Sequence, residues 1–245
     1  MRRSLLALAL GFVLSACWQG GEPTTGPSAT APASTEPSSG TSGTGPSVSG
    51  PPFNARCTLV LGFSVTRQWY EEGGFETQPG VNDARWELIF EGGGDVSVWA
   101  NPEAQPYHRT PISPCEAQPD RALFQVAALR WRNHSSEEMA SELQTATANI
   151  RATWPSVEVI ELIPIVGGPG GQPCEATSQP GRTVDASLMN PVMNGLIADV
   201  ANGDDVRAGP DLQLADCSQY MDGIGHITPE GSRHVAAVIA EHYGT

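Results

Sequence analysis

From residue 53 onward, short apolar runs alternate with stretches that carry helix start and stop signals. The runs that predict strands are 58–61, 95–100, 122–129 and 157–166. The stretches that predict helices are 83–91, 135–153, 183–201 and 229–244. Strands that alternate with helices are joined by right-handed crossovers, so they predict a mainly parallel sheet covered by helices on both faces. We therefore expect an α/β fold, with functional residues just beyond the carboxyl ends of the strands.

Capping residues mark the ends of these predicted helices. Ser135 is a favoured N-cap for the helix 135–153. Thr228 followed by Pro229 is typical of an N-cap and a first helical residue. Asn82 and Gly92 would begin and end the helix 83–91 in the same way.

The first residues carry an export signal. Arg2 and Arg3 precede the uncharged apolar stretch 5–14, which is too short to span a bilayer and is typical of a signal peptide. The sequence LSAC at 14–17 resembles the lipobox of bacterial lipoproteins, in which the cysteine, here Cys17, is lipidated. The alternative is an ordinary signal peptide with a chance cysteine near its cleavage site.

The segment 18–52 contains mostly Gly, Ser, Thr, Pro and Ala. It cannot bury enough apolar surface to offset its chain entropy, so it predicts a disordered tether. The remaining residues, 53–245, are enough for one well-buried core. We therefore expect a signal peptide (1–17), a tether (18–52) and one domain (53–245), exported and lipid-anchored to a bacterial membrane with the domain facing the periplasm or the cell exterior.

Charge narrows the possible partners and chemistry. The chain has 13 basic and 27 acidic side chains and a formal charge of -14, and every basic residue other than histidine is arginine. The absence of lysine excludes Schiff-base and lysine-nucleophile chemistry, and the negative charge disfavours nucleic acid as a partner. No CxxC, HExxH or calcium-loop spacing is present, so we expect neither a metal nor a cofactor.

Four cysteines remain after Cys17, an even number that predicts two disulfides in an exported protein. Cys57 and Cys115 each precede a predicted strand, which places both at the amino edge of the sheet. Cys174 follows a strand and Cys217 precedes the last loop, which places both at the opposite edge. Because a disulfide needs Cα atoms within about 7 Å, strand polarity predicts the pairs Cys57–Cys115 and Cys174–Cys217.

Candidate catalytic residues lie near both ends of the domain. Ser64 follows the first strand, and Asp222 and His226 lie on a glycine-rich loop before the last helix. A serine needs a histidine to accept its proton and a carboxylate to hold that histidine's tautomer. The alternatives are a helix N-cap for Ser64, a solvated loop histidine for His226 and a turn residue for Asp222.

This pattern resembles the SGNH (GDSL) hydrolases, which are esterases, lipases, thioesterases and carbohydrate deacetylases on a flavodoxin-like three-layer fold. The resemblance rests on Ser64 after the first strand and on Asp222 and His226 before the Thr-Pro-Glu-Gly at 228–231. It implies a five-stranded sheet, Ser64 as nucleophile, His226 as general base and Asp222 as its orienting group. It also implies that Asn133 and the Ser64 N–H donate to the oxyanion.

The chain departs from the family at GFS (62–64) and WRNH (131–134), and its Asp-to-His spacing is one residue longer. The family's oxyanion glycine would be among Gly92, Gly93 and Gly94 if 86–91 forms the second strand. With 95–100 as the second strand, as predicted above, these glycines precede the strand on the wrong side of the sheet, and the loop at Asn101 lies at the edge instead. Trp69 and Trp131 would flank the edge and could pack a substrate, or belong to the core.

The resemblance therefore predicts a membrane-anchored serine esterase, a monomer acting on a small-molecule or glycan ester. The rival hypothesis is an inactive lipoprotein of the same fold that binds a glycan or protein. A Ser64–His226 separation within about 3–4 Å favours the enzyme, and one above about 7 Å favours the binder.

Overall fold

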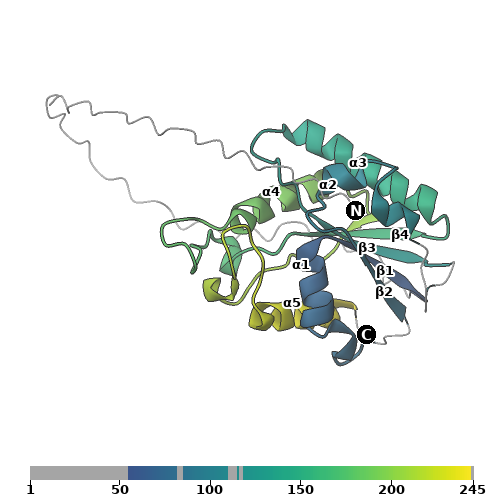
Figure 1. Cartoon of the computed structure of the whole chain (residues 1–245). Helices are drawn as coiled ribbons and strands as arrows, with labels where there is room; N and C mark the ends of the chain where they lie inside the picture. The colour runs from purple at the N-terminus through teal and green to yellow at the C-terminus, as the bar shows by residue number, and fades with distance from the viewer. Residues whose placement is uncertain (1–54, 82–84, 110–114, 116–117, 244–245) are drawn as a thin grey trace, which may run out of the picture. The chain divides into compact units, whose positions relative to one another are not determined.

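Five short parallel strands form the centre of the domain (Figure 1). The computed structural model describes residues 55–81, 85–109, 115 and 118–243. Along the sheet the strands lie in the order β2-β1-β3-β4-β5. Their bounds are β1 Thr58–Gly62, β2 Trp86–Phe90, β3 Arg121–Val126, β4 Val159–Pro164 and β5 Val206–Ala208. This order is that of flavodoxin-like doubly wound sheets, so the predicted fold class is confirmed.

Helices cover both faces of the sheet (Figure 1). Helices α2 (Val96–Trp99), α3 (Ser136–Thr153) and α4 (Asp185–Val200) lie on one face. Helix α1 (Ser64–Arg67), which continues into the π-helical turn η1 (Gln68–Glu72), and α5 (Pro229–Tyr243) lie on the other. The short 3-10 turns are η2 Phe75–Thr77, η4 Gln105–His108, η5 Pro169–Gly171 and η6 Cys217–Gln219. Strands β1 and β3 are buried along their whole length, as expected for parallel strands covered on both faces.

Two of the capped helices begin where the sequence predicted. The Ser135 hydroxyl accepts a hydrogen bond from the Glu138 N–H, and the Glu138 carboxylate accepts one from the Ser135 N–H. This reciprocal capping box satisfies two N–H groups that the helix itself leaves without acceptors. Helix α5 has Pro229 as its first residue, where the missing N–H costs no helical hydrogen bond.

The segment 83–100 is the main correction to the sequence prediction. The expected helix 83–91 contains strand β2, and the expected strand 95–100 contains helix α2. Strand β2 pairs with β1 in parallel, with Thr58 opposite Trp86, so pairing with a neighbour overrides the weak helical signal of a short run. Asp95 then caps α2 by accepting the Ser97 N–H. Consequently Gly92 follows a strand and lies at the carboxyl edge of the sheet.

Both predicted disulfides are present. Cys57 and Cys115 have Cα atoms 5.3 Å apart, and Cys174 and Cys217 have Cα atoms 5.4 Å apart. The first pair lies just before β1 and β3, and the second lies beside the loop that carries His226.

The expected signal peptide, with its lipidated Cys17, and the whole of the expected tether lie outside the described residues. Within the described part of the chain, no helix is long and apolar enough to cross a membrane.

Candidate active site

Ser64 lies at the carboxyl edge of the sheet, where strand β1 turns into helix α1. Phe63, in extended conformation, is the N-cap of α1, and its N–H donates to Thr66 Oγ1 at 3.0 Å. Ser64 is therefore the first helical residue and not the cap, which removes the capping alternative. A Cβ on Gly62 would lie 2.0 Å from Thr66 Oγ1, so a larger residue there would displace the Thr66 side chain.

The buried side-chain amide of Gln125 supports the turn between β1 and α1. Gln125 on β3 accepts hydrogen bonds from Thr66 Oγ1 at 2.7 Å and from Trp69 Nε1 at 3.0 Å. Its own NH₂ donates to the Pro164 carbonyl on β4. Because all these groups are buried, leaving any of them unpaired would cost about 1–3 kcal/mol, so the network holds the Ser64 turn against the sheet.

The Ser64 hydroxyl contacts His226, and His226 contacts Asp222. Ser64 Oγ lies 3.0 Å from His226 Nε2, and His226 Nδ1 lies 2.7 Å from Asp222 Oδ2. Since an ionised carboxylate can only accept, Nδ1 carries the proton, and Nε2 is free to accept the serine proton. All three side chains are partly exposed, so a substrate can reach them. The Ser64–His226 separation of 3.0 Å is the one that favours an enzyme over a binding protein.

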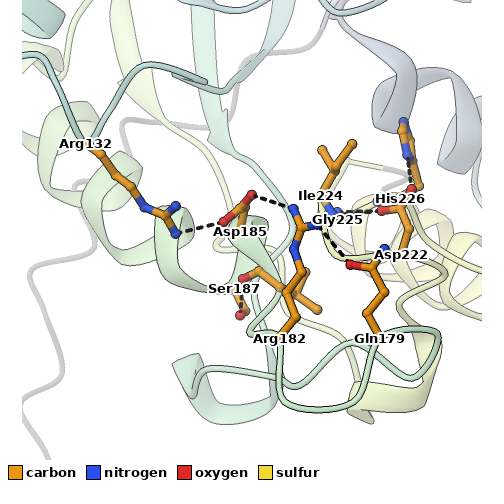
Figure 2. Close-up of polar contacts among 10 residues, drawn as sticks. Arg132, Gln179, Arg182, Asp185, Ser187, Asp222, Ile224, Gly225 and His226 are labelled. Carbon is orange, nitrogen blue, oxygen red and sulfur yellow. Dashed lines mark hydrogen bonds and ion pairs between the residues drawn. The ribbon is translucent and has the colours of Figure 1, made fainter. Parts of the chain in front are cut away.

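Asp222 is held in place by its own loop. Its Oδ1 accepts the N–H groups of Ile224, Gly225 and His226 at 3.0, 2.9 and 3.1 Å, while Oδ2 faces the imidazole (Figure 2). Partial burial opposes ionisation, but the His226 ring and these N–H groups outweigh it, so the pKa of Asp222 lies below its ordinary value. The Asp222 carboxylate therefore reaches and orients His226, although the Asp-to-His spacing is one residue longer than in the family that the sequence resembles.

The first turn of α4 supports this loop. The Asp185 N–H donates to the Gly223 carbonyl at 2.9 Å, and the Ala186 N–H donates to the Ile224 carbonyl at 3.1 Å. Gly225 adopts φ +124°, and a Cβ there would lie 2.2 Å from the Ala186 Cβ. The loop thus follows α4 so closely that only glycine fits at this position.

Two arginines and the Cys174–Cys217 disulfide complete this support. Asp185 forms ion pairs with Arg132 at 2.8 Å and with Arg182 at 3.6 Å (Figure 2). The Cys174 carbonyl accepts the Val184 N–H just before α4, so the disulfide ties the start of α4 to η6. The segment that carries Asp222 and His226 is therefore fixed from one side by α4.

Possible oxyanion donors lie in three places. The Ser64 N–H is at the first position of α1, where a helix offers no acceptor of its own. Gly92 and Gly93 follow β2 and are exposed at the same edge. Asn133 is exposed in the turn before α3, seven residues beyond the end of β3, and within the described part of the chain its side chain has no hydrogen-bond partner. Its predicted oxyanion role stays a prediction.

The two tryptophans differ from each other. Trp69 is fully buried, which confirms the core as the right one of its two predicted alternatives and excludes a place at the edge. Trp131 is partly buried and packs against the core. Among the described residues, the large hydrophobic side chains exposed to solvent are Leu129, Met221 and Ile224. Two of these lie on the loop of Asp222, and Leu129 follows β3.

Two supporting glutamines were missed by the sequence analysis. Gln125 is the single polar residue in the apolar run 122–129, a signal that could have indicated a buried hydrogen-bonding role. Gln68 has no such signal, because its partner lies 159 positions away. Within the described residues, no group of histidine, cysteine and acidic side chains could hold a metal ion.

The fold and the site together define an α/β protein with a Ser-His-Asp arrangement at the carboxyl edge of its parallel sheet. No family model and no curated protein matches the chain. Among solved structures, a candidate SGNH hydrolase from Slackia heliotrinireducens is 18% identical, with a TM-score of 0.47 over 77% of this chain and 99% of that one.

Two carbohydrate esterases are also similar. A family two enzyme from Cellvibrio japonicus is 15% identical, with a TM-score of 0.45 over 77% of this chain and 59% of that one. A family 3 enzyme from Talaromyces cellulolyticus is 13% identical, with a TM-score of 0.43 over 76% of this chain and 95% of that one. Identities of this size do not extend the activities of those proteins to this chain.

Proposed function

We propose that this protein is a serine esterase that acts through an acyl-enzyme. The observation that carries the proposal is the continuous contact from Ser64 Oγ through the His226 ring to the Asp222 carboxylate. The three residues occupy the hydrogen-bonding positions that nucleophilic catalysis by serine requires.

The geometry supports the following sequence of steps. Ser64 Oγ attacks the ester carbonyl carbon while its proton passes to His226 Nε2, and the charged imidazole is stabilised by Asp222. The tetrahedral oxyanion is bound by the Ser64 N–H and by a second donor, for which Asn133 is the candidate; one such donor contributes about 3–4 kcal/mol. Collapse expels the alcohol with the proton from His226. Water then attacks the acyl group by the same route and restores Ser64.

The surroundings of the site support a small-molecule or glycan ester as substrate. The formal charge of -14 favours neutral substrates over polyanions. Exposed Met221 and Ile224 next to His226 offer an apolar surface for one side of the ester. The export signal predicted for 1–17 and the tether predicted for 18–52 support an anchored enzyme. Cys17→Ser should abolish the incorporation of labelled fatty acid into the protein, whereas retained incorporation would contradict the anchor.

Hydrolysis of short p-nitrophenyl esters by the purified chain tests the activity. We expect Ser64→Ala and His226→Ala to lose at least about 10³-fold in kcat/KM. Ser156→Ala and His234→Ala are matched controls, because Ser156 bonds the Pro119 carbonyl and His234 lies on the last helix; both should keep full activity.

A fluorophosphonate reagent makes the test independent of the acyl group. Attack of Ser64 Oγ on phosphorus would expel fluoride and leave a covalent adduct on the peptide that contains Ser64. His226→Ala should slow this labelling strongly. If the folded wild type shows no labelling and no turnover on p-nitrophenyl or acetylated glycan esters, the enzyme proposal is wrong and the binding hypothesis stands.

A further inference from the structure

The side chain of Gln68 joins the two halves of the candidate site. Gln68 lies on η1, four residues after Ser64, and is 6% exposed. Its Nε2 donates to the Ile227 carbonyl at 3.1 Å, and its Oε1 accepts the Ile227 N–H at 3.2 Å. Ile227 directly follows His226. One amide side chain thus pairs with the backbone next to the general base in the way that a neighbouring strand would.

The two hydrogen bonds between the Gln68 amide and the Ile227 backbone form a clamp. Both residues are buried, so breaking these hydrogen bonds is costly. Ile227 is fully buried, so its N–H and carbonyl have no access to water that could replace Gln68. A buried backbone group without a partner is costly, and the loop would have to move to satisfy it. Since His226 is covalently joined to Ile227, such a movement would displace the imidazole relative to Ser64.

His226 has separate restraints on either side. The Asp222 side chain binds its ring and its N–H, and the Met221 N–H donates to its carbonyl at 2.7 Å. These contacts all lie within the loop and fix its internal shape. The clamp is different, because Gln68 belongs to the segment of Ser64 and fixes the loop relative to the nucleophile.

We infer that Gln68 is a positioning residue that sets the distance between Ser64 Oγ and His226 Nε2. The inference rests on the proposed function and adds to it a residue that touches no substrate. The amide of Gln68 both donates and accepts in this geometry, whereas an ionised carboxylate at the same place can accept but not donate. The requirement for a group that does both gives the inference a pH signature.

The first variant is Gln68→Met, which keeps the side-chain length and removes both hydrogen bonds. We expect kcat on p-nitrophenyl acetate to fall by about 10- to 100-fold, because misplacement of a catalytic group by about 1 Å costs on that order. KM should change less than about twofold, since the substrate contacts remain. Asn149→Leu is the control: Asn149 donates to the Trp99 and Ala100 carbonyls away from Ser64, and kcat per folded molecule should stay unchanged.

The second variant is Gln68→Glu. Burial beside a carbonyl raises the pKa of such a carboxyl group, and its protonated form again donates to Ile227 while accepting its N–H. The ratio of variant to wild-type kcat should therefore rise as the pH falls from 8 to 5.5. Effects of pH that the two proteins share cancel in this ratio. A ratio that is constant with pH would overturn the inference.

A structural measurement separates this inference from the proposed function. In a crystal structure of Gln68→Met we expect the Ser64–His226 distance to exceed 3.5 Å. If it stays at 3.0 Å and kcat falls no more than in Asn149→Leu, the inference is wrong while the esterase stands. If the wild type neither turns over esters nor reacts with the fluorophosphonate, the esterase fails, and the crystal structure alone decides whether Gln68 positions His226.

Discussion

The two disulfides offer a comparison in which stability and activity should separate. They close loops of similar length, with sequence separations of 43 for Cys174–Cys217 and 58 for Cys57–Cys115. The chain-entropy relation gives each about 4 kcal/mol of stabilisation, nearly the same for both. Their places differ, because only Cys174–Cys217 lies beside the loop of His226.

Replacing each pair with serines should therefore lower the free energy of unfolding by similar amounts. Activity should respond only to the loss of Cys174–Cys217. The Cys174 carbonyl holds the Val184 N–H, and the following turn of α4 holds the loop that carries His226. We expect kcat to fall about 10-fold when Cys174–Cys217 is removed, and to stay within about twofold when Cys57–Cys115 is removed.

Urea unfolding gives the stability of each double variant, and p-nitrophenyl acetate hydrolysis at 10 °C gives kcat. Low temperature keeps both variants mostly folded, and kcat is expressed per folded molecule from the unfolding curve. Since domains are stable by only about 5–15 kcal/mol, this correction is essential. Equal losses of kcat in the two variants, or full activity without Cys174–Cys217, would refute the reasoning.

Three further predictions concern single residues. Asp222→Asn should reduce kcat by about 10⁴-fold, because His226 loses the tautomer that catalysis requires. Since folding lowers the pKa of Asp222, the variant should also be less stable than the wild type at pH 7. This difference in stability should vanish as the pH falls through that pKa, as urea midpoints at pH 7 and pH 2.5 would show. Gly225→Ala should lower kcat at least about 10-fold, because the new methyl group meets Ala186 and φ is positive, whereas an unchanged kcat would contradict the tight loop. Asp120→Asn should lower the free energy of unfolding at neutral pH by about 1–3 kcal/mol and leave kcat unchanged. Burial disfavours the charge of Asp120, but hydrogen bonds from the N–H groups of Cys57 and Arg56 outweigh this effect and lower the pKa of Asp120. An unchanged urea midpoint would contradict this explanation.

Much of the fold was predictable because several elements carry strong local signals. Strand β1 and helix α3 are given by a short apolar run and by Ser135 with its capping box. The exchange of strand and helix in 83–100 shows the limit of local signals. The sequence of β2 fits either element, and what decides is its pairing with β1, which a local pattern does not contain.

In the candidate site, too, some residues could be predicted from the sequence and others could not. Ser64, Asp222 and His226 could be found from their places after a strand and before a helix, and strand polarity paired the four cysteines. Gln68 could not be found, because a glutamine in a helical segment has no distinctive pattern and its partner is the backbone of a distant residue. The three-dimensional path of the Asp222 loop, which decides whether the carboxylate reaches His226, was also beyond the sequence.

The contact between Ser64 and His226 joins residues 162 positions apart. A chain that is synthesised or threaded from its N-terminus therefore presents the nucleophile long before its base exists. Forming contacts between such distant residues slows folding, because a long loop has to close first. A nascent chain that stops before His226 cannot hold the pair. Under the proposed function, hydrolytic activity would therefore appear only after the His226 loop has docked against the Ser64 segment.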